Sequence, residues 1–287
     1  MSDQPSAGRG FPVLRTLGGS WPANGSGDGS RYLVTTAEQG FSSGPFARGN
    51  MADHVGDESG AVVANRVALQ RELGATRGLA FIQAVHGNSV GNVEAPGSYP
   101  GVDALVTTTP GLGLVALGAD CAVIGLHAAT VDGGQVVGVA HCGWRGLVED
   151  VIGAVVHAIR DAGGRQLDAV LGPAICGRCY RVNPERRGEV RDSCSPSVAD
   201  AALVSTDVDD DTTPGLDVHA GAHQRLVELG VSVNAIAGCT FESESWFSFR
   251  RASLDPEAGG RTGRHALAVM INTRFEGDGF EGGEYGH

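Results

Sequence analysis

The stretch of residues 112–147 constrains the fold of this chain more than any other part. Its sequence is LGLVALGADCAVIGLHAATVDGGQVVGVAHCGWRGL, in which a glycine turn, DGGQ, joins two apolar runs. Two such runs around a turn predict paired strands at the centre of a sheet. Each run also brings one soft metal ligand to a break in its pattern, Cys121 in GADC and His141 in AHCGWRG.

A third candidate ligand, His86, closes the apolar run LAFIQAVHG. This run has the length and the apolar density of a buried strand, and Gly87 ends it. By itself, a histidine at a strand end is more often hydrogen-bonded or exposed than bound to a metal. Together with Cys121 and His141, however, His86 predicts a zinc site with three protein ligands and an open fourth position.

A helix is expected after His141, where apolar residues recur with the period of an α-helix. These residues are Val148, Val151, Ile152, Val155, Val156 and Ile159. A strand is therefore predicted to run into a helix at CGWRG, where the first turn offers unpaired N–H groups and the positive end of the dipole. Arg145 falls in this turn and would hold a phosphate beside the metal; a surface salt bridge is the alternative role.

The chain has 287 residues, more than the usual domain, but an α/β fold of this length can be one domain around one core. We expect a flexible tail over residues 1–30, one folded domain over 31–272 and a flexible acidic tail over 273–287. Further strands are predicted at RYLVTTAE, DALVT, LDAVLGP, VSVNAIAG and HALAVMI, and a helix at VHAGAHQRLVELG. Residues 192–215 are polar and acidic and are predicted to form a mobile loop.

Another helix is predicted from Glu58 to Leu73, with Gly74 as its C-terminal stop. Its apolar face consists of Val62, Val63, Val67 and Leu73. Arg66 lies near this face, and an arginine in such a place more often covers the edge of the core with its stem than binds a ligand.

Charge and composition exclude several classes of partner. The formal net charge is −12, and binding to nucleic acid or an anionic membrane needs a concentrated basic face. No apolar run reaches the roughly 18 to 20 uncharged residues of a membrane span. The N-terminal sequence also lacks the basic start and apolar core of a secretory signal. We therefore predict a cytoplasmic protein that contacts neither nucleic acid nor membrane.

The six cysteines are scattered, and no structural disulfide is expected in a chain without an export signal. Two of them form a C-x-x-C pattern, Cys176 and Cys179. A single C-x-x-C can be half of a structural zinc site or a redox pair, but no second C-x-x-C exists to complete a four-cysteine site. Buried or loop-packing cysteines are therefore the favoured interpretation of this pair.

Taken together, the motifs resemble those of a known family. GFSSGPFARGN, HVGD, ANR, VHG, DALVT, GADC, AHCGWRG, GPAICGRCY, CT, FSFRR and TGRHA follow one another in this order. The chain resembles the laccase-domain family, which is also called polyphenol oxidase, purine nucleoside phosphorylase of the laccase-domain type, and peptidoglycan editing factor. The resemblance spans about residues 31–272.

The resemblance implies an α/β (α+β) fold, a single domain of mixed β-sheets flanked by helices. It implies a zinc ion held by His86, Cys121 and His141, the residues that match the family's VHG, ADC and AHxGWRG motifs. It also implies purine nucleosides and inorganic phosphate as substrates, with phosphorolysis of adenosine, inosine and guanosine, cleavage of methylthioadenosine, and deamination of adenosine. The positions that match the family's loop asparagine and basic residues are Asn50, Arg66 and Arg145.

The sequence departs from the family pattern, and Gln83, Cys142 and Arg181 are expected near the pocket, so the resemblance does not determine substrate preference. Ala84 stands where glutamine is common, although Gln83 is adjacent, Cys142 replaces a common alanine, and Arg181 follows Cys-Tyr where an acid is frequent. GADCAVIGLHA is also less regular than the usual run after the ADC motif. The three zinc ligands are retained.

Zinc with two histidines and one thiolate leaves a position for water of lowered pKa, so deamination at C6 of adenine is chemically intelligible. The proton shuttle is unidentified, because the H-x-E…P-C-x-x-C signature of cytidine-type deaminases is absent. For phosphorolysis, phosphate attacks C1′ while the purine leaves, and the helix start with Arg145 would position that phosphate.

Three other kinds of chemistry compete with this zinc enzyme: copper-dependent oxidation, metalloprotease hydrolysis and cysteine-dependent hydrolysis. Laccase chemistry is disfavoured, since copper clusters of that type use His-x-His pairs and none of the nine histidines is two positions from another. A metalloprotease is also disfavoured, because His219 and His223 are four residues apart but lack the glutamate of the H-E-x-x-H signature. The alternative function is a cysteine hydrolase or amidase acting in peptidoglycan editing, with Cys121 as nucleophile and His141 as base.

Overall fold

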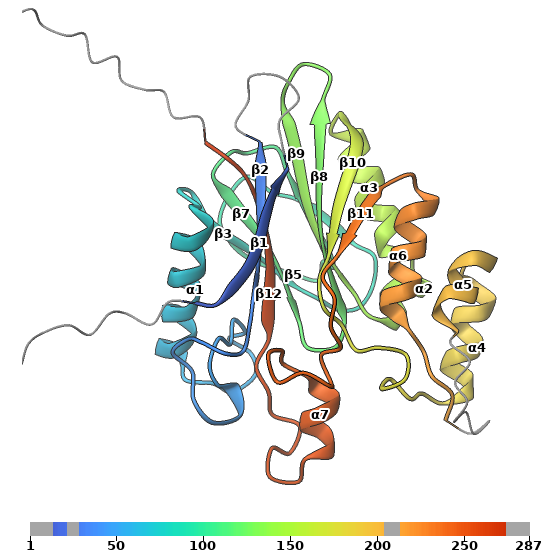
Figure 1. Ribbon diagram of the computed structural model, residues 1–287. Coiled ribbons are helices and arrows are strands. Elements are labelled where there is room, and N and C mark those ends of the chain that lie inside the picture. Colours follow the sequence, from blue (N-terminus) through green and yellow to red (C-terminus); the bar gives the residue numbers. More distant parts are fainter. Residues whose placement is uncertain (1–13, 22–28, 204–212, 274–287) are drawn as a thin grey trace, which may run out of the picture.

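Two six-stranded β-sheets form the centre of the structure, a computed structural model that describes residues 14–21, 29–203 and 213–273 (Figure 1). The first sheet has the order β1 (Thr16–Trp21), β2 (Ser30–Thr35), β12 (His265–Ile271), β7 (Leu112–Gly118), β3 (Gly78–Gln83) and β5 (Gly97–Pro100). The second has the order β11 (Ser232–Ala235), β10 (Gly164–Leu171), β8 (Ala122–Thr130), β9 (Gln135–Cys142), β6 (Ala104–Thr107) and β4 (Val90–Asn92). Both sheets mix parallel and antiparallel pairs, as the family resemblance predicted.

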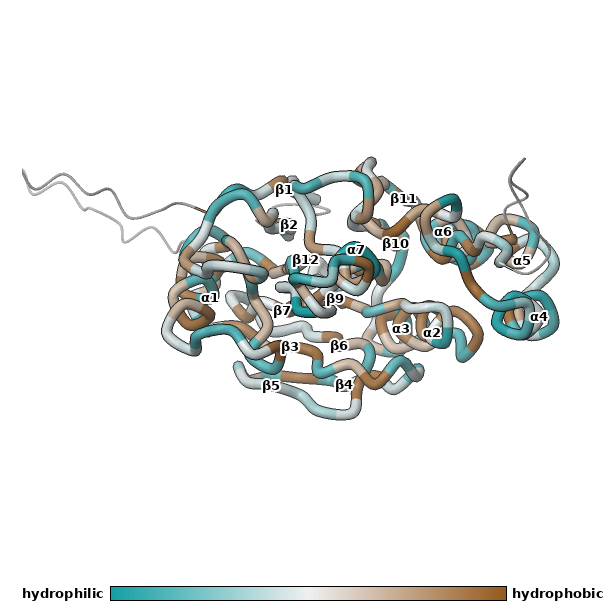
Figure 2. Tube along the Cα trace, turned by 90° about the horizontal axis from the view of Figure 1, so that it is seen from below, coloured by the Kyte–Doolittle hydropathy of each residue, from teal (hydrophilic) through white to brown (hydrophobic). Residues whose placement is uncertain are grey.

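Helices cover the two outer faces of the sheets. Seen from below in Figure 2, α1 (Ser59–Leu73) lies beside the first sheet, and α2 (Trp144–Val148), α3 (Val151–Asp161) and α6 (Val218–Glu228) lie beside the second. Farther along the second side lie α4 (Pro184–Ser193) and α5 (Pro196–Ala202), while α7 (Phe249–Leu254) lies at the end of the sheets. A short 3₁₀ helix spans Gly44–Phe46. The expected single α/β domain of mixed sheets flanked by helices is confirmed.

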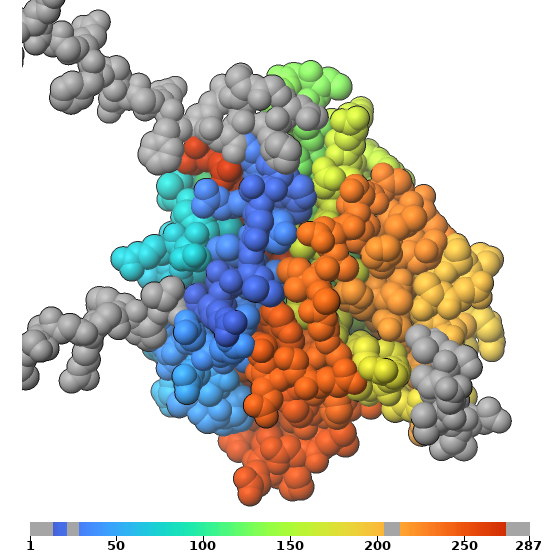
Figure 3. Space-filling model, viewed as in Figure 1, coloured from blue at the N-terminus to red at the C-terminus, as the bar shows by residue number. Residues whose placement is uncertain are grey.

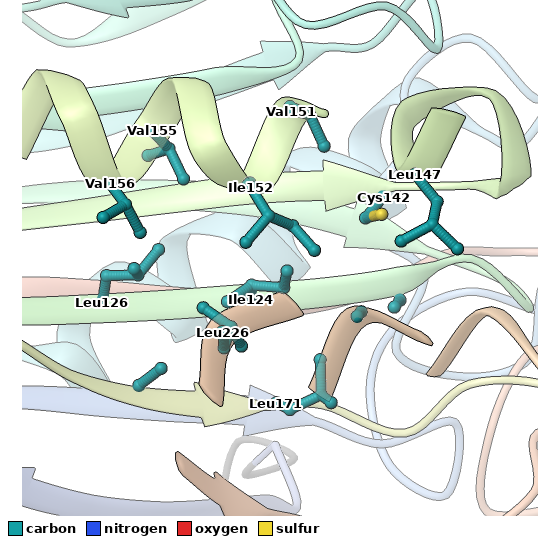
Figure 4. Close-up of a cluster of buried hydrophobic side chains, with 14 of the residues drawn as sticks. Ile124, Leu126, Cys142, Leu147, Val151, Ile152, Val155, Val156, Leu171 and Leu226 are labelled. Atoms are coloured by element: carbon teal, nitrogen blue, oxygen red, sulfur yellow. The ribbon is translucent and has the colours of Figure 1, made fainter. Parts of the chain in front are cut away.

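Three apolar clusters correspond to these layers. One lies between the sheets and includes Val139 and Leu267, and another joins α1 to the first sheet through Leu69 and Leu73. The largest joins α2, α3, α5 and α6 to the second sheet, and Figure 4 shows part of it around Ile152. Because helices and the first sheet cover both faces of β8, its residues from Ala122 to Ala129 are all buried.

The predicted central hairpin is confirmed, since β8 and β9 pair antiparallel around the DGGQ turn. The strands that precede it, however, do not continue the same sheet. β6 and β7 flank the Pro110-Gly111 turn but lie in different sheets, and GADC carries the chain from β7 in the first sheet to β8 in the second. Cys121 therefore lies where the chain crosses between the sheets.

The helix predicted after CGWRG is two helices. Asp150 has a left-handed backbone with a φ of 58° and separates α2 from α3, and its side chain accepts a hydrogen bond from the N–H of Gly153. An aspartate tolerates this conformation and caps the helix that follows. The periodic residues from Val151 to Ile159 still face the core.

Other expectations from the sequence need correction. The segment expected to be an N-terminal tail contains β1, because residues 16–21 pair with β2 throughout their length. In α1, Val63 and Val67 are each 60% exposed, and the buried face includes Asn65 and Leu69 instead.

The expected loop of residues 192–215 also contains α5, and α4 ends within it. Ser195 caps α5 and Pro196 begins it, two signals that outweigh the polar composition. The rest of this loop over 204–212 and the expected tail beyond residue 273 lie outside the described residues. Among the described residues, no helix combines the length and apolar character of a membrane span.

Candidate functional site

His86, Cys121 and His141 meet at one point, where strands of both sheets end. His86 follows β3, Cys121 precedes β8, and His141 is near the end of β9. One ligand atom from each of the three side chains lies within 4.8 Å of the other two. The Sγ of Cys121 is 4.0 Å from Nε2 of His86, and the two imidazole rings are nearly perpendicular with centroids 5.0 Å apart. The structure thus brings together the three residues predicted as ligands.

Asp103 holds the loop that carries His86. Its buried carboxylate accepts hydrogen bonds from the backbone N–H groups of Val85, His86 and Gly87, at 3.0, 2.7 and 2.8 Å. These bonds support the left-handed backbone of His86, which has a φ of 65°. The carbonyl of Asp103 also accepts the N–H of His141, at 2.8 Å. One residue therefore positions two of the three candidate ligands, and no pattern in the sequence had pointed to it.

His141 presents one nitrogen to the site. Its Nδ1 lies 2.8 Å from the carbonyl oxygen of Leu117, to which it donates, while its buried Nε2 has no hydrogen-bond partner among the described protein atoms. Burial, together with the nearby His86, lowers the pKa of His141 to about 4. The imidazole is therefore neutral near pH 7, with a free lone pair on Nε2, as metal coordination requires.

The surroundings of Cys121 favour the neutral thiol over the thiolate when no metal is bound. Burial and the neighbouring carboxylate of Asp120 raise the pKa of its thiol to about 12, although the positive charge of Arg264 opposes them. A thiol needs a lowered pKa or a hydrogen-bonded base to react as a thiolate, and a bound metal would deprotonate it outright. The imidazole nitrogen in contact with Cys121 Sγ is Nε2 of His86, at 4.0 Å, whereas Nε2 of His141 makes no hydrogen bond, so the geometry does not favour His141 as the base of the hydrolase alternative.

Gly143 leaves space for the cluster. A Cβ atom at this position would lie 3.0 Å from Cδ2 of His86 and 3.1 Å from Sγ of Cys121, tighter than ordinary contacts. The orphaned Nε2 of His141, the neutral imidazole and this close approach of three side chains all fit a metal ion. Two imidazoles and one thiolate are a ligand set that zinc accepts, with its fourth position open.

A cavity of about 620 Å³ opens over the cluster, within the usual range of roughly 300–1,000 Å³ for small-molecule sites. All three ligands line it. Its apolar wall includes Ile82, Leu117 and Phe249, and its polar wall includes Gln83 and Arg264. It can therefore hold a flat apolar ring next to polar and charged groups.

A second cavity of about 350 Å³ adjoins the first and shares Ala119, Cys121 and Phe249 with it. Its lining includes Trp144, Tyr180, Arg186 and Arg250. Arg186 lies 4.7 Å over the ring of Trp144 and donates to the hydroxyl of Tyr180, at 3.1 Å. Cys121 thus lines both cavities, of which the first contains Arg264 and the second contains Arg186 and Arg250.

The other predicted substrate contacts lie elsewhere. Asn50 is fully buried, and its side-chain oxygen accepts the backbone N–H groups of Ala52 and Arg264, both at 2.9 Å. Arg66 donates to the carbonyl of Met51, pairs with Asp53 and stacks over Phe81. These contacts fit the role of covering the edge of the core.

Arg145 is exposed, with its guanidinium 5.3 Å from the ring centroid of Trp144. None of Asn50, Arg66 and Arg145 lines either of the two cavities.

The residues that approach the cluster from the C-terminal part of the chain were not predicted from the sequence. Arg264 lies directly before β12 in TGRHA, and Phe249 and Arg250 lie in FSFRR. Both motifs had contributed to the family resemblance, and a basic residue next to a strand end was the available signal. No local pattern could show that these segments, more than 100 residues after Cys121, pack against it.

The fold and this site define the class of protein: a two-sheet α/β domain with a His, Cys and His cluster at the base of a cavity. The model of the family described as multi-copper polyphenol oxidoreductase laccase matches residues 31–272, and the chain belongs to this family.

Among similar proteins, a purine nucleoside phosphorylase of Streptomyces coelicolor is 40% identical over 231 residues, which cover 78% of this chain and 91% of that protein. A purine nucleoside phosphorylase of Streptomyces griseus is 37% identical over 238 residues, covering 80% and 91%. Among solved structures, the YlmD protein of Geobacillus stearothermophilus has a TM-score of 0.74 at 28% identity, covering 92% of this chain and 100% of that one.

Proposed function

We propose that this protein is a zinc-dependent purine nucleoside phosphorylase that accepts adenosine, inosine, guanosine and methylthioadenosine and also deaminates adenosine. The similarity to relatives that carry the name purine nucleoside phosphorylase supports the class of reaction. The observation that carries the proposal is the meeting of the His86, Cys121 and His141 cluster with Arg264 in one cavity. We further propose that the enzyme acts in the cytoplasm and binds neither nucleic acid nor membrane.

The chain's own residues bind and orient the two substrates. Ile82, Leu117 and Phe249 offer apolar surface to the purine, which excludes water from the bond to be broken. Arg264 lies close enough to lower the pKa of the Cys121 thiol, and its guanidinium can bind phosphate. Its backbone is held by Asn50, and its Nη1 donates to the carbonyls of Thr262 and Gly263.

In phosphorolysis, an oxygen of phosphate forms a bond to C1′ of the ribose while the bond from C1′ to the purine nitrogen breaks. Holding both substrates in line converts a bimolecular step into an intramolecular one. His86, Cys121 and His141 would hold the zinc ion, which when bound acts as a Lewis acid that stabilises developing negative charge. Asp103 keeps His86 and His141 in place for that role.

The proposal is tested by incubating the purified protein with adenosine, with and without phosphate, and following adenine, inosine and hypoxanthine by chromatography. Phosphorolysis predicts adenine only when phosphate is present, and deamination predicts inosine without phosphate. Metal content measured on the same sample distinguishes zinc from copper. Absence of both products from protein that contains the metal would overturn the proposed activity.

Two substitutions refine the test. Cys121→Ser removes the only thiolate of the cluster and is expected to reduce both activities by at least about 100-fold, following the loss of a metal ligand. Cys194→Ser is the matched control, since Cys194 lies outside both cavities and contacts the carbonyl of Leu147. Arg264→Gln is expected to raise the KM for phosphate more than it affects deamination, while Arg261→Gln, at an exposed position, leaves both unchanged.

A further inference from the structure

A second group of potential metal ligands lies outside the site described above. The Sγ atoms of Cys176, Cys179 and Cys239 and a carboxylate oxygen of Glu242 all lie within 4.8 Å of one another. None of these residues belongs to the His86, Cys121 and His141 cluster. We propose that they form a second zinc site, which is structural and closed by four protein ligands.

The fold brings these ligands from two parts of the chain that are about 60 residues apart in sequence. β10 and β11 are parallel neighbours, and the segments that follow them run side by side, as the yellow-green and orange segments do in Figure 3. Ala174 and Cys239 form a parallel bridge, and the N–H of Thr240 donates to the carbonyl of Ala174, at 3.0 Å. The cysteines therefore meet because two adjacent parallel strands end at the same edge of the sheet.

The backbone around the cysteines already has features of a metal-binding turn. The N–H groups of Cys179 and Tyr180 both donate to the carbonyl of Cys176, at 3.0 and 2.9 Å, which folds C-x-x-C into a tight turn with both sulfurs on one side. The N–H of Cys176 also donates to Sγ of Cys239, at 3.3 Å, a bond that stabilises negative charge on the sulfur. The third cysteine thus replaces the second C-x-x-C that the sequence lacks.

The composition of the site favours a soft metal such as zinc over hard cations. Three sulfurs are soft ligands, which exclude magnesium and calcium as the resident ion, and four protein ligands leave no open position for a reaction. The fourth ligand, Glu242, accepts a hydrogen bond from the thiol of Cys179, at 3.4 Å, and has Arg178 at 3.5 Å. All six cysteines are free thiols in the structure, so no disulfide competes for these sulfurs.

The proposed ion would stiffen a wall next to the functional site. Ile175 and Tyr180, which flank the first two cysteines, line the second cavity. The N–H of Ile175 donates to the carbonyl of Asp120, at 3.0 Å, and the hydroxyl of Thr240 donates to its carboxylate, at 2.7 Å. Since Asp120 adjoins Cys121, an ion that ties both segments together also holds the loop that delivers Cys121.

The proposal is tested on the full-length protein, purified under reducing conditions and loaded with zinc, by metal analysis of four samples. The wild type is expected to hold two zinc ions per chain. The double variant Cys176→Ser/Cys179→Ser and, independently, Cys121→Ser are each expected to hold one, and the control Cys194→Ser is expected to hold two. A double variant that holds as much zinc as the wild type would overturn the proposal.

A spectroscopic measurement keeps the test decisive if the double variant fails to fold. Cobalt(II) loaded into the wild type and into Cys121→Ser is expected to give strong sulfur-to-metal charge-transfer absorption in both, since three thiolates remain in the second site. Absorption that disappears with Cys121→Ser, or a Cys176–Cys179 disulfide found by peptide mass mapping of the protein as isolated, would overturn the site. Absence of phosphorolysis from wild-type protein that shows this absorption would instead contradict only the proposed function.

The structural role has its own readout. Chelation that removes the second ion is expected to lower Tm of the Cys121→Ser protein by several degrees, because binding energy at a structural site contributes to folding. The same chelator is expected to leave Tm of the protein that also carries Cys176→Ser/Cys179→Ser unchanged. An equal fall in both proteins would contradict a structural ion at these cysteines.

Discussion

The buried carboxylate of Asp103 is as important for the candidate site as the ligands themselves. It binds three consecutive backbone N–H groups around His86, and its own carbonyl binds the N–H of His141. The carboxylate can accept the three bonds from the His86 loop at once, because each of its oxygens has two lone pairs, and the backbone carbonyl remains for His141. The geometry of the cluster therefore depends on a residue that touches no metal.

Asp103→Asn is expected to weaken both the fold and the proposed metal site. The amide group would place N–H donors against the N–H of Gly87 or of His86, which leaves a buried donor without a partner and costs about 1–3 kcal/mol. Misplacing the ligands should lower metal affinity by about 10- to 100-fold. Urea denaturation and chelator competition measure the two effects. The control Asp161→Asn, at an exposed helix end, should change neither; unchanged affinity in Asp103→Asn would contradict the positioning role.

Gly143→Ala tests the space around the cluster. Gly143 has a φ of −84°, so alanine causes no backbone strain there, but its Cβ would lie 3.1 Å from Sγ of Cys121. We expect metal affinity to fall while Tm of the metal-free protein changes little. A zinc titration against a fluorescent chelator and a thermal melt after chelation measure this. If Tm of the metal-free variant falls as much as in a core substitution while zinc affinity is unchanged, Gly143 is needed for folding and not for metal binding.

At the scale of the secondary-structure elements, Asp150 decides how the chain continues after the site. It breaks the periodic segment into α2 and α3 and caps α3. Both of its oxygens also accept hydrogen bonds from Arg225 in α6, at 2.9 and 2.7 Å. This paired contact joins α3 to α6 over the second sheet, where the largest apolar cluster lies.

Asp150→Ala is expected to destabilise the protein by roughly 2–4 kcal/mol. The variant loses a helix cap, places alanine in a left-handed conformation and removes one of the two acidic partners of Arg225, whose side chain is 26% exposed and also pairs with Glu228. Asp150→Asn retains the cap and tolerates the backbone, so it should lose less than half of that amount. The free energy of unfolding in urea measures both. Equal losses in the two variants would show that only the charge of Asp150 matters.

At the scale of the whole molecule, packing two sheets against each other buries titratable groups that a single sheet would expose. His265 begins β12 in the first sheet, is fully buried, and lies edge-on to the ring of Trp246 at a centroid distance of 5.6 Å. Burial, together with the positive charge of Arg264, lowers the pKa of His265 to about 3. The folded protein therefore resists protonation of this group far below the pH at which the unfolded chain accepts a proton.

The free energy of unfolding is therefore expected to fall as the pH drops below 6.5, the ordinary pKa of histidine, towards about 3. In this range the unfolded chain binds a proton at His265 and the folded chain does not, so the contribution is complete above pH 6.5. For this one group the loss at pH 5 is about 2 kcal/mol. Urea denaturation at pH 7 and pH 5 measures it.

Comparing variants isolates the contribution of His265. His265→Phe keeps a ring against Trp246 without a titratable group, and the difference between the two pH values should shrink by about 2 kcal/mol. His157→Gln, at an exposed position, should leave that difference unchanged. A His265→Phe protein with the pH dependence of the wild type would be evidence that His265 is not responsible.

The sequence by itself determined the elements whose apolar residues recur at a regular spacing or that end at a clear turn signal. The β8–β9 hairpin, the end of α1 at Gly74 and the periodic face of α3 follow from local spacing, because a strand or helix exposes or buries residues at a fixed period. The ligand residues could also be named in advance, since Cys121 and His141 interrupt apolar runs and match family motifs.

Only the tertiary structure decided what meets at the site. The placement of β6 and β7 in different sheets, the approach of Arg264, and the role of Asp103 depend on how strands distant in sequence are ordered, which local periodicity does not encode. The same holds for Cys239 beside Cys176, which adjacent parallel strands bring together. Long-range pairing therefore turns separately recognisable residues into a site.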